Sequence, residues 1–426
     1  MIPLLAIVVV AIIVASAAIV MTRGGGGGNE TFIPDVASGT GTVYGNADGN
    51  CYIDEVDLAI INSIIEGERS LDDFPFADAD CDGIVTSADA DMVQRIINNE
   101  SLKVNVLDTQ DNIVPVQYPV DDFIVLAGSN LAPLMNVLDV SDKVVAAAYS
   151  TLDPIRDYSI AQGIANGSIT QLTTNGTAAD LDTISNLDPM PSVMLTEYSR
   201  MYDLDSDENI TTLNQWGIDV LCMECRDPGD DTRSMAVFGI LLGRSDEAQS
   251  YIDFVEGVYE EIRETIGDSW GTSTVMISSL SSGLCGTSSG YHSMIEEMAG
   301  GDNLADFTDI SLRVEVGATW IFEERYASDY MLLGASSNYG GSGFSESYLE
   351  GYVERYSNLP VWQEGNVWAF STSIPVVARV AYFAETLYPE LFEDGWANSI
   401  HQSFVDTYFD TEFTVNEEQF LLNISS

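Results

Sequence analysis

From about Val104 to the C-terminus, short apolar runs alternate with segments whose apolar residues recur at helical spacing. The runs "DDFIVLAG", "DKVVAAAY" and "SVML" predict buried strands, and "LAPLMNVLDV" and "AADLDTISNL" predict helices between them. The same alternation restarts at "STVMISS" and continues through "DYMLLGASSN" and "NVWAFSTSIP" to a last amphipathic helix, "PVVARVAYFAETLYPELF". Alternating strands and helices indicate βα units, in which a mostly parallel sheet carries helices on both faces.

A single long helix is predicted between the two series, from about Ser245 to Ile266, because no turn signal interrupts its apolar periodicity. The fold class is therefore α/β, with two Rossmann-like lobes joined by one long helix. We assign lobe 1 to residues 104–244, the connecting helix to residues 245–267 and lobe 2 to residues 268–426. Loops that follow parallel strands gather at one edge of the sheet, so each lobe should present a crevice there.

The first 22 residues are uncharged and mostly apolar. As a helix, about 20 such residues span roughly 30 Å, the thickness of a bilayer core. This segment is predicted to be a signal anchor that holds the chain in the membrane through a transmembrane helix. The alternative is a cleaved signal peptide, with Ala15–Ala17 as the small-residue cleavage site. Residues 23–42 form a glycine-rich linker of the flexible kind.

Two short segments share an unusual spacing of oxygen-bearing side chains. Counted from the start of "NADGNCYIDEVD" and "DADCDGIVTSAD", positions 1, 3, 5, 9 and 12 all carry one, and position 7 offers a backbone carbonyl. Ca²⁺ takes six to eight oxygen ligands, so alternating ligands on a tight loop suit it. The predicted ligands are Asn46, Asp48, Asn50, Tyr52, Asp54 and Asp57 in loop 1, and Asp78, Asp80, Asp82, Ile84, Thr86 and Asp89 in loop 2.

A pair of solvated acidic turns is the alternative, because Asp, Asn and Gly favour turns. Two matches 32 residues apart, each followed by an amphipathic helix, favour two Ca²⁺ sites instead. The pattern resembles the dockerin module, a small all-α, EF-hand-like unit, over residues 43–102. Loop 1 departs from that pattern, with Asn46 in place of Asp and Cys51 in place of Gly. We therefore expect the second site to be the stronger one.

The dockerin resemblance implies a cohesin-like protein partner. In that family the partner is chosen by positions 10 and 11 of each loop, which are here Glu55, Val56, Ser87 and Ala88. The alternative is that the module packs on its own chain as a calcium-stabilised spacer.

The charge of the chain narrows its partners. It has 67 acidic and 15 basic residues, a formal net charge of −52, so no basic face is available to neutralise nucleic-acid phosphates.

An oxidising exterior would permit a Cys51–Cys81 disulfide. N-glycosylation sequons begin at Asn29, Asn99, Asn166, Asn175, Asn209 and Asn423. With the N-terminal segment they predict an extracytoplasmic, cell-surface protein that is membrane-anchored or secreted.

Several stretches in order resemble the helix-linked class of ABC-transporter substrate-binding proteins, which serve ferric siderophores, haem and cobalamin. They are "ISNLDPMPSVML", "FGILLGRSDEAQSYIDFVEG", "MIEEMAGGDNLAD" and, near the end, "GNVWAF", "AETLYPELF" and "IHQSFVDTYF". The resemblance covers roughly 310 residues. It implies a ligand held between the lobes, an ABC permease as the receiving partner, and a connecting helix that restricts closure to a small rocking motion.

Candidate ligand contacts are the residues at strand ends and nearby aromatic rings. They are Ser129, Asn130, Glu197, Tyr198 and Arg226 in lobe 1, and Ser279, Tyr291, His292, Tyr339 and Trp368 in lobe 2. The chain has only two histidines, His292 and His401, too few for the histidine-rich shell of a bare zinc or manganese site. A metal chelate or corrinoid brings its own ligands, and haem would need only an axial histidine or tyrosine.

Catalytic signatures are missing from the sequence. It contains no GxSxG, P-loop, HExxH or dinucleotide-binding GxGxxG motif, and adjacent acids such as Glu296 and Glu297 point apart on a helix. The chain is therefore not predicted to be an enzyme. The alternative to a transport receptor is a cell-surface adaptor, without a transport role, that assembles through dockerin–cohesin pairing.

Overall fold

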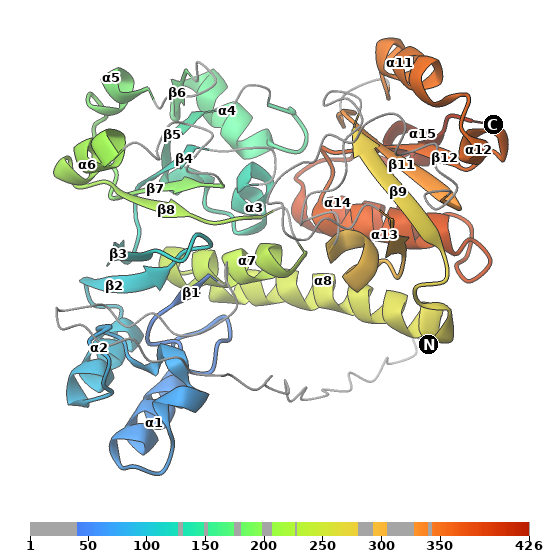
Figure 1. Cartoon of the computed structure of the whole chain (residues 1–426). Coiled ribbons are helices and arrows are strands. Elements are labelled where there is room, and N and C mark those ends of the chain that lie inside the picture. Colours follow the sequence, from blue (N-terminus) through green and yellow to red (C-terminus); the bar gives the residue numbers. More distant parts are fainter. Residues whose placement is uncertain are drawn as a thin grey trace, which may run out of the picture.

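The computed structural model describes residues 41–126, 131–148, 152–173, 180–197, 207–225, 228–279, 293–304, 328–339 and 343–425. Within these residues, two five-stranded sheets form separate lobes and a three-stranded sheet belongs to an N-terminal unit, residues 41–118 (Figure 1). The predicted α/β architecture of two lobes with parallel sheets is confirmed. No described helix has the length and apolarity needed to cross a bilayer, and residues 1–22 lie outside the described part of the chain.

Lobe 1 is a fully parallel sheet in the order β6-β5-β4-β7-β8. The chain adds β5 and then β6 on one side of β4, and afterwards adds β7 and β8 on the other side. The direction of winding therefore reverses at β4. The elements are β4 (Phe123–Leu126), α3 (Leu131–Val137), β5 (Val144–Ala148), α4 (Tyr158–Asn166), β6 (Thr170–Leu172), α5 (Leu181–Ile184), β7 (Val193–Thr196), α6 (Asp207–Gln215) and β8 (Asp219–Cys222).

Lobe 2 has the order β10-β9-β11-β12-β13, with β13 antiparallel to β12. Its strands are β9 (Thr274–Ser279), β10 (Asp302–Asn303), β11 (Tyr330–Ala335), β12 (Val367–Ser371) and β13 (Leu421–Asn423). Its helices are a π-helical turn η6 (Ser293–Met298), α11 (Glu346–Tyr356), α12 (Pro360–Gln363), α13 (Val376–Leu387), α14 (Trp396–Tyr408) and α15 (Glu417–Phe420).

Two consecutive helices, α7 (Pro228–Leu242) and α8 (Ser245–Ile266), lead from lobe 1 to lobe 2. The bounds of α8 agree with the sequence prediction. Its buried residues recur every three or four positions, from Tyr251 through Val255 to Ile262, so one face is apolar. That face contacts α3 and α7 on one side and η6 and α13 on the other, and Figure 1 shows α8 running beneath both lobes. One hydrophobic core therefore continues from lobe to lobe through α8.

The N-terminal unit contains two helices and a small antiparallel sheet. Helix α1 (Glu55–Ile65) and helix α2 (Ser87–Ile97) pack together, and two short 3₁₀ helices, η1 (Leu71–Asp73) and η2 (Pro75–Ala77), lie between them in the chain. Strands β1 (Thr42–Val43), β2 (Leu102–Leu107) and β3 (Ile113–Tyr118) pair in that order. The hairpin of β2 and β3 was not predicted, although Leu102, Val104 and Val106 alternate as buried positions.

The N-terminal unit is joined to lobe 1 by specific bonds. The backbone N–H and the hydroxyl of Thr109 both donate to the carbonyl of Cys222 at 3.0 Å, and Glu224 N–H donates to Thr109 Oγ1 at 2.8 Å. Lys103 Nζ forms an ion pair with Asp219 of β8 at 2.9 Å. The other lysine, Lys143, donates to the carbonyls of Val120 and Leu242, the latter at the end of α7. Both lysines of the chain therefore serve joints between elements.

Candidate functional site

In lobe 1 the winding reverses between β4 and β7. In an open parallel sheet, the carboxyl ends of the strands at such a point are the usual position of a ligand crevice. Glu197 follows β7 directly and is buried. Its Oε1 accepts from the N–H of Leu131, the first residue of α3, at 2.9 Å, and its carbonyl accepts from Cys222 Sγ at 3.4 Å. Glu197 thus links the segments that follow β4, β7 and β8. The candidates Ser129, Asn130, Tyr198 and Arg226 lie outside the described residues.

The lobe 2 candidates are more scattered. Ser279 is the last residue of β9, at the expected carboxyl end, whereas Trp368 is second in β12, near the amino end of that strand. Tyr339 follows β11 but is only 1 % exposed, with its ring packed against those of His401, Phe409, Phe413 and Phe420. In this arrangement its ring belongs to the lobe 2 core. Tyr291 and His292 lie outside the described residues.

The two lobes meet through a set of polar residues that we call the inter-lobe contact. It joins Asp153, Arg156 and Asp157 of lobe 1, all buried, to the buried Tyr339 and the half-buried Ser373 of lobe 2. Arg156 Nε and Nη2 donate to the two carboxylate oxygens of Asp157 at 2.8 and 2.7 Å. Arg156 Nη1 donates across the boundary to the Ser373 carbonyl at 3.1 Å, and Tyr339 N–H donates to Asp153 Oδ2 at 2.8 Å. Sequence analysis did not identify Arg156, although "DPIRD" follows a predicted strand.

The electrostatics of the inter-lobe contact are those of a desolvated ion pair. Arg156 is 4 % exposed and Asp157 is fully buried. Burial raises the pKa of Asp157, and the bidentate Arg156 guanidinium opposes that rise. Beside the pair lies a small crevice that is partly open to solvent. It is lined by α3, α7 and α8 on one side and by residues 373–376 and Phe404 of lobe 2 on the other.

The inter-lobe contact continues into the interior of lobe 2. The Tyr339 hydroxyl lies 2.6 Å from His401 Nε2, and the Tyr382 hydroxyl lies 3.1 Å from His401 Nδ1. His401 is fully buried, and burial lowers its pKa to about 3, so the ring is neutral. Both of its nitrogens already have a hydrogen-bond partner. His401 therefore has a structural role and cannot coordinate a metal without breaking this network.

The acidic loops of the N-terminal unit have nearly the same backbone bonds. In both, the position-12 carboxylate accepts from the N–H groups of positions 3 and 9: Asp57 from Asp48 and Asp54, Asp89 from Asp80 and Thr86. Each position-12 residue is also the third residue of its helix, α1 or α2, and completes a capping box there. The N–H groups of positions 5, 7 and 11 likewise bond to the side chains of positions 3, 5 and 9 in each loop.

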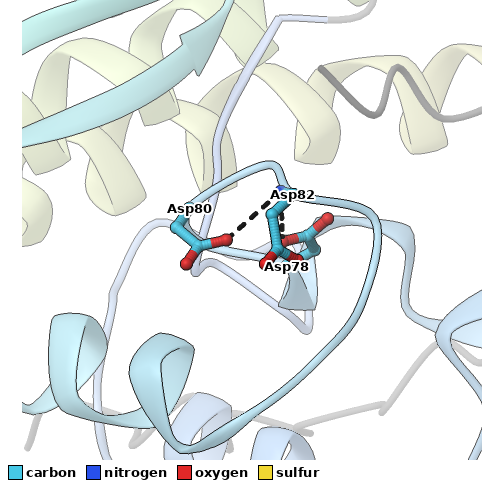
Figure 2. A group of neighbouring side chains, drawn as sticks. All are labelled: Asp78, Asp80 and Asp82. Atoms are coloured by element: carbon cyan, nitrogen blue, oxygen red, sulfur yellow. Dashed lines mark hydrogen bonds between the residues drawn. The ribbon is translucent and has the colours of Figure 1, made fainter. Parts of the chain in front are cut away.

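Loop 2 gathers carboxylate oxygens at one point. One oxygen from each of Asp78, Asp80 and Asp82 lies within 4.8 Å of the others. Asp78 accepts from the N–H groups of Asp82 and Gly83 at 3.2 and 2.7 Å, and Gly83 supplies the positive φ of 91° at position 6. Figure 2 shows the three aspartates around the turn, with the N–H of Asp82 bonded to Asp78 and Asp80. Burial, reinforced by neighbouring carboxylates, raises the pKa of Asp78 to about 6.

Loop 1 differs from loop 2 at positions 1 and 6. Cys51 is not among the residues of the described chain that have positive φ, so the turn at position 6 is not that of Gly83. The Asn46 amide donates from Nδ2 to the Asn50 carbonyl at 2.7 Å, which places it across the loop. Its Oδ1 has no hydrogen-bond partner, although Asn46 is only 2 % exposed. A buried oxygen without a donor is costly, and a cation in the loop would satisfy it.

Both loops present a donor set made of oxygens, which fits a hard cation such as Ca²⁺ rather than a soft one. The position-12 carboxylate of loop 1, Asp57, has a pKa raised to about 6, chiefly by burial. The position 10 and 11 residues, Glu55, Val56, Ser87 and Ala88, are all exposed, and Val56 is 52 % exposed.

The disulfide that an oxidising exterior would permit is not formed, which corrects that expectation. Cys51 and Cys81 are free and buried in different clusters: Cys51 faces α8, whereas Cys81 packs with Tyr44 and Leu107. Loop 1 is therefore held by packing against α8 and not by a covalent bridge. Cys222 and Cys225 are also buried, so neither is an exposed thiol.

Comparison with solved structures places the fold among bacterial solute-binding proteins. A TroA-like periplasmic binding protein, FepB from Veillonella parvula, has a TM-score of 0.56 at 15 % identity over 74 % of this chain and 98 % of that chain. The molybdate periplasmic binding protein MolA of Haemophilus influenzae, bound to molybdate, has a TM-score of 0.55 at 11 % identity, over 73 % and 99 % of the two chains. Ceue of Helicobacter pylori with Ni(II) bound gives 0.51 and 13 %, over 71 % and 94 %.

At these identities the likeness shows a shared fold and leaves function to be argued from the site. No family model and no curated protein matches the chain in sequence.

Proposed function

We propose that this chain is the extracytoplasmic solute-binding protein of an ABC importer. The observation that carries the proposal is the architecture: two parallel-sheet lobes, joined by the single helix α8, with the fold of periplasmic binding proteins over nearly their whole length. Such a fold leaves the carboxyl-end loops of both sheets facing one gap. A solute would be held there, released unchanged and received by a permease, which requires no catalytic group.

The proposed solute is a metal chelate, such as a ferric siderophore or haem, or a corrinoid. Among the described residues, the carboxylates that gather like metal ligands are those of loop 2, far from the inter-lobe contact in the chain. Of the two histidines, His401 is committed to Tyr339 and Tyr382, which leaves His292 alone as a candidate ligand. A single histidine cannot build a shell for a bare transition metal, whereas a chelate arrives with its coordination complete.

The proposed solute contacts are the strand-end residues on the two sides of the gap: Ser129, Asn130, Glu197, Tyr198, Arg226, Ser279, Tyr291 and His292. Glu197 supports this placement because it ties α3 to the ends of β7 and β8 at the point where the winding reverses. Glu197 and the Tyr339 ring are both buried, so each could contact a solute only if the residues around it moved. Trp368, near the amino end of β12, is not part of the proposed set.

We further propose that loops 1 and 2 bind one Ca²⁺ each, and that the N-terminal unit contains a dockerin-like module. The parallel hydrogen-bond patterns, the converging carboxylates of loop 2 and the buried Asn46 oxygen of loop 1 support this. Bound Ca²⁺ would neutralise the clustered carboxylates and fix the start of α1 and α2. Loop 2 should be the stronger site, because it has three aspartates and a glycine turn where loop 1 has two asparagines and Cys51.

The exposed residues Glu55, Val56, Ser87 and Ala88 remain free to meet a cohesin-like protein while the unit stays docked on lobe 1. This observation favours a second candidate function, a cell-surface adaptor that is assembled through this surface. The two functions are separable, because an adaptor needs no solute. We propose an extracytoplasmic location, with residues 1–22 as anchor or signal.

Solute binding by the full chain tests the proposal. Tryptophan fluorescence would be titrated with cyanocobalamin, haem and ferric siderophores of the catecholate and hydroxamate types. One of these should bind saturably, and Tyr198→Ala with Tyr291→Ala should weaken it about tenfold or more. Arg95→Met, an exposed change in the N-terminal unit, is the control and should not alter binding. Absence of binding across the panel, with calcium binding and cohesin pairing intact, would favour the adaptor.

A further inference from the structure

The N-terminal unit and α8 share a buried interface. Val43 and Cys51 belong to the same hydrophobic cluster as Tyr251 and Val255 of α8. Strand β1 contacts α7, and Figure 1 shows the unit lying beside α7 and α8. The Tyr52 hydroxyl donates to Asp246 Oδ1, in the first turn of α8, at 3.0 Å. Loop 1 is therefore in direct contact with the helix that joins the two lobes.

Both sides of this interface carry acidic residues. Loop 1 contributes Asp48, Asp54 and Asp57, whereas the exposed face of α8 contributes Asp246, Asp253 and Glu256. The bond from the Tyr52 hydroxyl to Asp246 Oδ1 brings one of the α8 carboxylates against loop 1. Without a cation, carboxylates repel one another across this contact.

The loop also contains a group that points to a ligand. Asn46 is only 2 % exposed. Its Nδ2 donates across the loop to the Asn50 carbonyl, and its Oδ1 accepts no hydrogen bond. A cation at this point would satisfy the Asn46 oxygen and reduce the repulsion between the loop and α8 at the same time. Tyr52 connects cation binding in loop 1 with the contact to α8, because its carbonyl is at ligand position 7 and its hydroxyl is bonded to Asp246.

Resting on the calcium sites proposed above, we propose that loop 1 and the amino-terminal half of α8 form one calcium-dependent joint. Ca²⁺ in loop 1 holds the N-terminal unit against the connecting helix, and the Asp246 carboxylate of α8 in turn increases the affinity of loop 1 for Ca²⁺. The two effects are reciprocal by thermodynamic linkage. Calcium thereby sets the rigidity of the helix about which the lobes move, although no solute contact lies in the N-terminal unit.

The experiment is a calcium titration of the full chain followed by hydrogen–deuterium exchange and mass spectrometry. Peptides from loop 1 and loop 2 give a calcium midpoint for each loop, and peptides from residues 245–256 report on α8. The test variant is Asp246→Asn, which removes the α8 charge that contacts Tyr52, keeps an acceptor for its hydroxyl and leaves every proposed ligand in place. The matched control is Glu264→Gln, an exposed charge about five turns further along the same helix.

In the wild-type chain, calcium should protect loop 1, loop 2 and residues 245–256. At low ionic strength the test variant should raise the loop 1 midpoint on the order of fivefold, as expected for loss of a charge near a divalent cation, and leave the loop 2 midpoint unchanged. The control should shift neither midpoint. If calcium protects both loops but not α8, or if the loop 1 midpoint is unchanged in the test variant, the proposed joint is wrong and the calcium sites stand. Protection of neither loop overturns the calcium sites and the joint with them.

Discussion

The ion pair between Arg156 and Asp157 gives the sharpest test of the inter-lobe contact. Replacing Arg156 by Met keeps an unbranched apolar stem and removes the charge and the donors of the side chain. Asp157 would then be a fully buried carboxylate whose remaining bond is the one from Asp153 N–H at 2.8 Å. The Ser373 carbonyl of lobe 2 would also lose its donor.

Removal of one partner from a buried pair leaves an uncompensated charge and typically costs about 3–5 kcal/mol. Replacing both partners is much milder, so Arg156→Met with Asp157→Asn should cost about 1–2 kcal/mol, which covers the lost bond to Ser373. The double-mutant cycle should therefore show a coupling energy of about 2 kcal/mol or more. Arg95→Met is the control, because the Arg95–Glu100 pair is about half exposed on both sides, and it should cost less than about 1 kcal/mol.

The assay is urea denaturation of the full chain, monitored by tryptophan fluorescence at constant calcium. All six tryptophans lie beyond residue 200, so the signal comes from the lobes and α8 and not from the N-terminal unit. An Arg156→Met variant no less stable than Arg95→Met would refute the reasoning. So would a double variant whose cost equals the sum of the two single variants, because the pair would then have no coupling.

Three further outcomes follow from the structure. Asp78→Ala with Asp89→Ala should lower the number of Ca²⁺ ions bound per chain from two to one by calorimetry, and an unchanged number would dismiss loop 2 as a site. Because burial lowers the pKa of His401 to about 3, the unfolded chain binds a proton below about pH 6.5 that the folded chain does not. Stability should thus be lost as pH falls below 6.5, by about 1.4 kcal/mol per unit, and His401→Gln should flatten this slope in urea titrations at several pH values. Lys143→Met removes two bonds to backbone carbonyls and should cost about 2 kcal/mol in the same assay, whereas a cost near zero would mean that this joint is unimportant.

The lobes and their connecting helix were predictable because their signals are local. Helix α8 has one apolar face over its full length, and Gly243 and Gly267, both with positive φ, mark breaks just outside it. Most strands of the two sheets are short apolar runs that periodicity detects, whereas the polar edge strands β6 and β10 and the short β13 were not predicted. The alternation of Leu102, Val104 and Val106 also indicates a strand. The hairpin was not predicted because the apolar runs that begin at about Val104 were assigned to lobe 1.

The inter-lobe contact could not be predicted, because it depends on pairs that are distant in sequence. Arg156 and Ser373 are 217 residues apart, and Asp153 and Tyr339 are 186 residues apart. The same limitation explains the cysteines. Cys51 and Cys81 occupy similar loops, but their surroundings are set by α8 in one case and by Tyr44 and Leu107 in the other. Loop spacing suggested ligands for calcium, whereas only the fold showed that loop 1 contacts the connecting helix.

Native mass spectrometry of the full chain with cyanocobalamin, haem and ferric siderophores tests the central claim most directly. The account predicts one solute bound per chain at micromolar concentration or below, with the same complex formed when residues 46 and 78 are replaced by alanine in the presence of excess solute. A chain that binds none of these solutes, while it still binds calcium, would contradict the assignment as a solute receptor.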